Sequence, residues 1–237
     1  MEWSDFFLIF SNLSMLLAIN FSVKNKLFLE AWIFFQSMTI SMTYHGLDTT
    51  YYINNHNQLW RAFKFIDFYA AILVMITLSV YTAKIKDKYK GIPHIILGTF
   101  SVFMLSYGSW DISKELSIAG VCFTMVFGIF LFRKTCPRFR TKNLIKGGIF
   151  AISGFGCFHI KYYNDSLPYW ATHTMWHIFI MLSAFYIMRI HPIEEIRAMS
   201  RDAIHRVNSV ENFIMARSPR RQQLQDEPEH EPPIGAA

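Results

Sequence analysis

Charged residues are scarce in this sequence of 237 residues: Asp, Glu, Lys and Arg make up 17%, against 52% hydrophobic and 17% aromatic residues. A soluble globular domain carries nearer a quarter charged residues. The deficit is concentrated in long apolar segments, and the charges collect in the links between them. Because lipid cannot hydrate an ion, this distribution is typical of a membrane protein and disfavours a soluble enzyme.

Cysteine is also rare, with three residues in the chain. Cys122 and Cys157 fall within apolar segments and Cys136 within a basic link. No pair is placed to form a disulfide on the outer side of a membrane, so we expect none. The acidic start of the chain lacks the basic region and the small-residue cleavage site of a signal peptide, so we expect the first apolar segment to remain as a helix.

Apolar segments of membrane-spanning length recur along the chain. About 20 residues are needed to cross a hydrocarbon core as a helix. The segments that approach this length are 5–23, 27–45, 61–83, 92–109, 114–132, 143–161 and 170–190. We therefore predict an all-α fold, a seven-transmembrane helix bundle that forms one membrane domain over residues 1–191.

Basic residues mark alternate links between these segments. They follow the first, third, fifth and seventh segments: Lys24 and Lys26, then Lys84, Lys86, Lys88 and Lys90, then Arg133, Lys134, Arg138, Arg140 and Lys142, and finally a basic tail. The positive-inside rule places such links in the cytosol, so we predict an N-terminus outside the cell and a cytosolic C-terminus. The formal net charge of +6 thus reflects topology, and we predict no nucleic-acid partner.

The chain after the last apolar segment has a different character. Over residues 192–216, apolar residues recur at helical spacing and charges of both signs lie between them. This pattern predicts an amphipathic cytosolic helix that lies on the membrane or packs against the bundle. Residues 217–237 are polar and proline-rich, which predicts a disordered tail.

A few polar side chains lie inside the apolar segments, where an ionisable group is costly and needs a reason. Ser41 and His45 are four residues apart, as are His173 and His177, so each pair shares one helix face. An i,i+4 histidine pair can hold a metal with both rings, and a catalytic zinc takes three protein ligands and a water. We therefore predict a zinc site at His45, His173 and His177.

The predicted topology places these groups at one depth. His45 lies near the outer end of its segment, and Asp67, His173 and His177 lie within about 10 Å of the outer ends of theirs at the helical rise. We predict that Asp67 orients or deprotonates a zinc-bound water and that Ser41 hydrogen-bonds to this water or to a substrate oxygen. The alternative is that all of these are interhelical polar residues satisfied by hydrogen bonds.

These motifs resemble those of a known group of membrane proteins. The segments Ser41-Met-Thr-Tyr-His45, Asp67-Phe68 and His173-Thr-Met-Trp-His177 are similar to the signature of the CREST superfamily of membrane hydrolases, which includes alkaline ceramidases and the progestin and adiponectin receptors. The sequence around them more closely resembles the transmembrane-protein-eight family. We therefore expect the CREST fold and its zinc site.

The resemblance also implies a function. Short members of the transmembrane-protein-eight family act in myoblast fusion, so we expect a plasma-membrane protein that promotes cell–cell fusion and carries a zinc-hydrolase-type site in the outer half of the bundle. The candidate partners are a membrane lipid in the bundle cavity, a second copy of the chain and a second fusion protein. Two alternatives stay open: a zinc-dependent lipid amide or ester hydrolase of the alkaline-ceramidase type, and a receptor or scaffold whose site is only structural.

Overall fold

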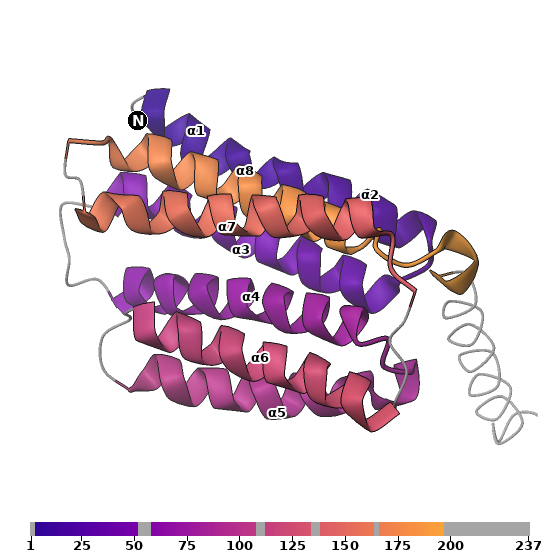
Figure 1. Ribbon diagram of the computed structural model, residues 1–237. Helices are drawn as coiled ribbons and strands as arrows, with labels where there is room; N and C mark the ends of the chain where they lie inside the picture. The colour runs from indigo at the N-terminus through magenta and orange to yellow at the C-terminus, as the bar shows by residue number, and fades with distance from the viewer. Residues whose placement is uncertain (1–2, 52–57, 108–111, 134–137, 164–165, 197–237) are drawn as a thin grey trace, which may run out of the picture.

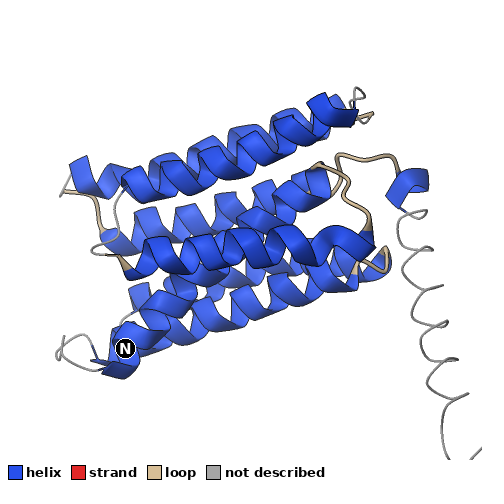
Figure 2. Ribbon diagram, turned by 90° about the horizontal axis from the view of Figure 1, so that it is seen from below, coloured by secondary structure: helices blue, strands red, loops and turns tan. Residues whose placement is uncertain are grey.

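The described part of the chain is almost entirely helical. The computed structural model describes residues 3–51, 58–107, 112–133, 138–163 and 166–196, and no strand occurs in these ranges (Figure 2). The prediction of an all-α fold is confirmed. The helices are α1 (Trp3–Ser11), the short 3-10 helix η1 (Asn12–Met15), α2 (Leu16–Lys24), α3 (Phe28–Tyr51), α4 (Gln58–Thr82), α5 (Asp87–Ser106), α6 (Ile112–Arg133), α7 (Thr141–Tyr163) and α8 (Tyr169–Ile187).

These helices run side by side as long rods (Figure 1). The broken rod formed by α1, η1 and α2 lies with α3, α7 and α8 in one group, and α4, α5 and α6 form a second group below them in that view. Helix α4 joins the two groups, because it contacts α3 and α8 as well as α5 and α6. The rods overlap in sequence with the apolar segments, although α3 continues six residues beyond the predicted end at residue 45 and α5 begins five residues before residue 92. The predicted site residues lie on α3, α4 and α8.

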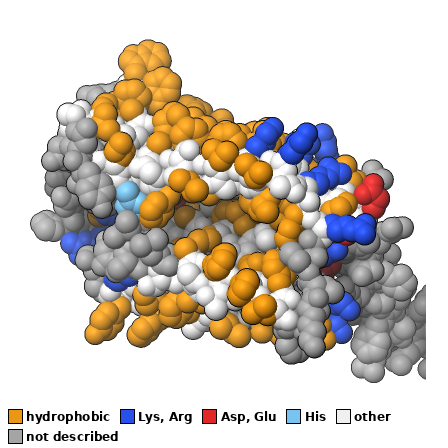
Figure 3. All heavy atoms as spheres, in the orientation of Figure 1, with side chains coloured by type: hydrophobic (Ala, Val, Ile, Leu, Met, Phe, Trp, Pro, Cys, Tyr) orange, Lys and Arg blue, Asp and Glu red, His pale blue; other side chains and the backbone are white. Residues whose placement is uncertain are grey.

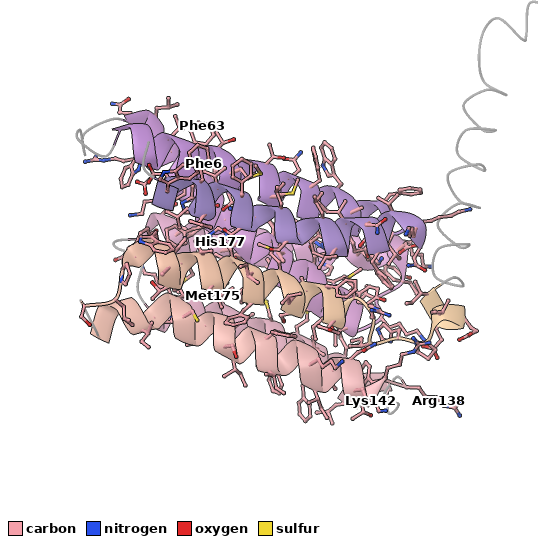
Figure 4. The ribbon with its side chains drawn as sticks, turned by 90° about the horizontal axis from the view of Figure 1, so that it is seen from above. Phe6, Phe63, Arg138, Lys142, Met175 and His177 are labelled. Atoms are coloured by element: carbon pink, nitrogen blue, oxygen red, sulfur yellow. The ribbon has the colours of Figure 1, made fainter. Side chains whose placement is uncertain are left out.

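The surface of the bundle is apolar over much of its length (Figure 3). Lys and Arg side chains gather at one end of this face, and Figure 4 places Arg138 and Lys142 at the end opposite Phe6. Two helical stretches, Asp5–Lys24 and Gln58–Thr82, are long and apolar enough to cross a membrane. Membrane crossing by all of the rods, and their orientation, remain predictions.

The first rod is broken near its middle. The Ser11 hydroxyl donates a hydrogen bond to the Leu8 carbonyl (2.8 Å), and the Ser14 hydroxyl donates one to the Ser11 carbonyl (2.7 Å). Short polar side chains that bond to helix carbonyls in this way often bend a helix. The sequence predicts one helix over residues 5–23, and the structure shows this range with the η1 turn inside it.

Helices α7 and α8 pack closely because two glycines of α7 face α8. A Cβ atom on Gly147 would lie 2.7 Å from the Cδ1 atom of Ile187, and one on Gly154 would lie 2.9 Å from the Cγ1 atom of Ile180. Small residues let helix backbones approach in this way in membrane proteins. The Ser183 hydroxyl also donates a hydrogen bond to the Gly147 carbonyl (2.9 Å). These contacts hold α8, which carries the histidine pair.

The chain after α8 folds back against the end of the bundle. The Tyr81 hydroxyl donates a hydrogen bond to the Met188 carbonyl (2.7 Å), and Ile196 is fully buried. Residues 193–196 are helical and lie at the start of the predicted amphipathic helix. The remainder of that helix and the whole predicted tail lie outside the described residues, so their boundaries remain predictions.

Candidate metal centre

Three histidines from two helices meet inside the bundle. His45 lies in the last third of α3, and His173 and His177 lie one turn apart in the first half of α8. The three residues are 0%, 8% and 1% exposed, respectively. One ring nitrogen from each lies within 4.8 Å of the others, close enough for a shared metal ion. Figure 4 shows His177 toward the end of the bundle that holds Phe6.

The distances between the rings agree with this interpretation. The Nε2 atoms of His45 and His177 are 3.2 Å apart. Two imidazole nitrogens bound to one tetrahedral zinc are separated by about 3.3 Å, as the Zn–N bond length and the tetrahedral angle require. The ring centroids of the three histidine pairs lie 4.9, 5.0 and 4.8 Å apart. The His45–His177 pair therefore has the spacing of two ligands of one ion, whereas ring nitrogens as far apart as 4.8 Å would move closer together to share it.

A fourth residue, Asn12 of η1, orients His177. The Nδ2 atom of Asn12 donates hydrogen bonds to the carbonyls of Leu8 (3.2 Å) and Ile9 (3.4 Å), so its Oδ1 atom is an acceptor. The Nδ1 atom of His177 lies 2.6 Å from this oxygen and must therefore carry the proton. In neutral His177 the Nε2 atom then presents a lone pair to the cluster. The predicted site does not include Asn12, although an asparagine inside an apolar segment indicates a polar partner.

The cluster also contains buried nitrogens that the chain leaves without a partner. Within the described ranges, His45 Nδ1 and His173 Nε2 have no hydrogen-bond partner. Buried polar atoms are nearly always paired, so hydrogen bonding within the described chain does not account for these two nitrogens. A metal ion held by one nitrogen of each ring would give such a nitrogen a partner. Three imidazoles suit zinc, copper, iron or nickel, and these residues fit such an ion.

Ser41 and Asp67 meet beside the histidines. The two residues are 6% and 9% exposed, and the Ser41 hydroxyl hydrogen-bonds to the carboxyl group of Asp67. Ser41 lies one turn before His45 on the same face of α3, and Asp67 reaches it from α4. The fold thus brings the two predicted catalytic residues to one side of the cluster, while their roles remain predictions.

An apolar cavity of about 450 Å³ lies between α4, α6, α7 and α8. Phe68 and Trp176 line this cavity. Phe68 directly follows Asp67, and Trp176 directly precedes His177. The Trp176 ring also packs against both histidines of α8, with centroids 4.9 Å from His173 and 4.6 Å from His177. The rest of the lining is aliphatic or aromatic apart from one serine, which suits a hydrocarbon chain.

Comparison with known proteins places the chain in a family. A family model matches residues 2–178, a range that includes every residue of the candidate centre. The chain belongs to the DUF3522 family, described as a protein of unknown function. No curated protein matches the chain. Because membership in the DUF3522 family carries no named activity, function must be argued from the geometry of the site.

Proposed function

We propose that this member of the DUF3522 family is a multipass plasma-membrane protein that holds a zinc ion at His45, His173 and His177 and promotes cell–cell membrane fusion. One observation carries the zinc assignment: three buried histidine rings whose nitrogens lie within 4.8 Å of one another. The fusion role is supported by the resemblance to the transmembrane-protein-eight family. Within that family the chain resembles Myomaker, the short member that acts in myoblast fusion.

The histidines, Asp67 and Ser41 each have a distinct part in this proposal. The histidines tie α3 to α8, because one ion takes ligands from both helices. Zinc held there would supply a Lewis acid that polarises an ester or amide carbonyl and makes nearby water more acidic. In this proposal Asp67 accepts or holds a proton and the Ser41 hydroxyl orients its carboxyl group, which is supported by the hydrogen bond between the two side chains.

A second candidate function is zinc-dependent hydrolysis of a lipid amide or ester. The apolar cavity favours it, because Phe68 and Trp176 connect the cavity wall to the site and would place an acyl chain there. A membrane lipid is the proposed occupant. For fusion itself we favour a structural role of the metal, since joining two bilayers requires no covalent bond to break.

Cell mixing by the Asp67→Asn variant, at matched surface level, separates the two functions. The change is nearly isosteric and leaves all three histidines in place, so zinc per chain should equal that of the wild type. Under a structural role, fusion persists. If hydrolysis is required, fusion and the release of lipid products both fall by about 100-fold or more. A wild-type protein that neither mixes cells nor releases a product from lipid extracts would contradict both functions.

A further inference from the structure

Ser11, Asn12 and Ser14 are polar residues of the first rod, and Asn12 also contacts α8. The hydroxyls of Ser11 and Ser14 donate hydrogen bonds to carbonyls of their own rod, and the Nδ2 atom of Asn12 does the same. These bonds use every side-chain donor of Asn12 on its own rod, which leaves the amide oxygen as the atom that faces α8. Asn12 is fully buried, so water does not compete for this oxygen.

From this geometry we propose that Asn12 is a positioning residue for the metal centre, an inference that rests on the proposed zinc site. Asn12 would fix the Nδ1–H tautomer of His177 and thereby control metal affinity from the first rod. The 2.6 Å contact is the evidence: an amide oxygen cannot donate, so the opposite tautomer would set two lone pairs against each other. That tautomer would also place a proton on the Nε2 atom that faces His45, 3.2 Å away.

The expected size of the effect follows from metal sites in general. A hydrogen bond to the second nitrogen of a histidine ligand fixes the ring and makes the ligand more basic, and its loss costs roughly 10- to 100-fold in metal affinity. The competing interpretation is that Asn12 only joins α1 to α8. Under that interpretation its removal would lower the stability of the bundle and leave the affinity of the folded protein unchanged.

Zinc affinity of the full chain in detergent, measured by competition with a chromophoric chelator, tests the proposal. Asn12→Leu removes the acceptor and should weaken zinc binding roughly 10- to 100-fold. Asn12→Asp loses the two donors to Leu8 and Ile9 but keeps an acceptor beside His177, and should bind zinc more tightly than Asn12→Leu. Asn20→Leu makes the same chemical change at an exposed position of α2 and should leave affinity unchanged. Equal affinity in Asn12→Leu and wild type would overturn the inference while leaving the zinc site intact.

A second readout needs no metal. In ¹⁵N-histidine-labelled, zinc-free protein, the His177 signals, assigned by their loss in His177→Gln, should show the Nδ1–H tautomer in the wild type and in Asn12→Asp. They should show a mixture of tautomers in Asn12→Leu. Should Asn12→Leu fail to fold, the zinc-free wild type decides, because a His177 ring with its proton on Nε2 would contradict the proposed role of Asn12. Absence of zinc from the wild type would refute the proposed site and this inference together.

Discussion

The histidine cluster of His45, His173 and His177 can be compared with a second group of buried and half-buried polar side chains, which we call the ion-pair cluster. The ion-pair cluster contains Glu30, Thr77, Asp87, Lys90 and His94. Lys90 pairs with Glu30 and with Asp87 (2.8 Å). Both ring nitrogens of His94 have partners, the Lys90 carbonyl at 2.7 Å and the Thr77 hydroxyl at 3.1 Å. Each of these five residues therefore has a partner within the chain.

The two clusters lie at opposite ends of α3, with Glu30 in its first turn and His45 about 22 Å further along the helix. Both contain fully buried side chains, for which a missing polar partner is costly. The chain satisfies the ion-pair cluster by itself, which is what a purely structural network requires. It leaves ring nitrogens of His45 and His173 without a described partner, as it also does the hydroxyls of Ser22 and Thr174 and the Nδ1 atom of His191. Buried atoms of this kind need an explanation, and for the histidine cluster we propose a bound metal ion.

Removing a histidine ligand should have the largest effect. His177→Ala is expected to lower zinc from about one ion per chain to near zero, and to reduce stability by several kcal/mol because metal-binding energy is also folding energy. Metal analysis of the purified protein, together with thermal unfolding before and after chelator treatment, measures both. The chelator should lower the Tm of the wild type and should not change that of the variant.

The control is His94→Ala, which removes a histidine from the ion-pair cluster. This variant should keep its zinc and should show the same chelator-induced fall in Tm as the wild type. Full zinc occupancy in His177→Ala would contradict the ligand assignment. Loss of zinc in His94→Ala would show that the two clusters are not independent.

Breaking the ion pair should have the next largest effect, and on stability alone. Lys90→Met leaves the carboxylate of Glu30 buried without its cation, which should cost about 3–5 kcal/mol. Zinc per folded chain should not change. The double variant Glu30→Leu/Lys90→Met removes both charges and should recover most of this loss, since paired removal is often close to neutral. Thermal unfolding of the wild type, Lys90→Met and the double variant tests this. A double variant less stable than Lys90→Met would show that the unpaired Glu30 carboxylate is not the cause of the loss in stability.

The presence and order of the rods follow from the sequence. The break in the first rod and the close approach of α7 to α8 do not. Apolar segments of about 20 residues separated by polar links predict where helices occur, because bilayer thickness sets a length. They do not predict the helix ends, since α3 continues to Tyr51 and α5 begins at Asp87. The break at Asn12–Met15 depends on which carbonyls the side chains of Ser11 and Ser14 reach, and apolar periodicity does not report that. Similarly, the approach of α7 to α8 depends on which glycines face Ile180 and Ile187, and this is set by the rotation of each helix.

The two clusters differ in how well the sequence predicts them. His173 and His177 are four residues apart, so the helical repeat alone places them on one face. The contribution of His45 follows once the two helices are assumed to pair at the same depth. Lys90 and Glu30 appear in the sequence only as a link residue and a residue near the start of an apolar segment. Their pairing depends on the long reach of a lysine side chain between rods, which spacing does not predict.

The smallest expected effect concerns the packing that supports the histidine cluster. On Gly154→Ala the new Cβ atom would lie 2.9 Å from the Cγ1 atom of Ile180, three residues after His177. Overpacking should outweigh the gain in helix propensity and cost about 1 kcal/mol net. Gly156→Ala is the matched control, because its Cβ atom meets nothing within 4 Å. That variant should be more stable than the wild type by about 0.5–1 kcal/mol.

A double-mutant cycle uses this small effect to separate the clusters. Since α7 packs on α8, the costs of Gly154→Ala and His177→Ala should not add, because both changes act on the position of α8. The cost of Gly154→Ala should add to that of Lys90→Met within about 0.5 kcal/mol, because the ion-pair cluster lies on α3, α4 and α5. Unfolding free energies of the single and double variants give both coupling terms. Coupling of Gly154→Ala to Lys90→Met, with none to His177→Ala, would show that the packing of α7 on α8 supports the ion-pair cluster and not the histidine cluster.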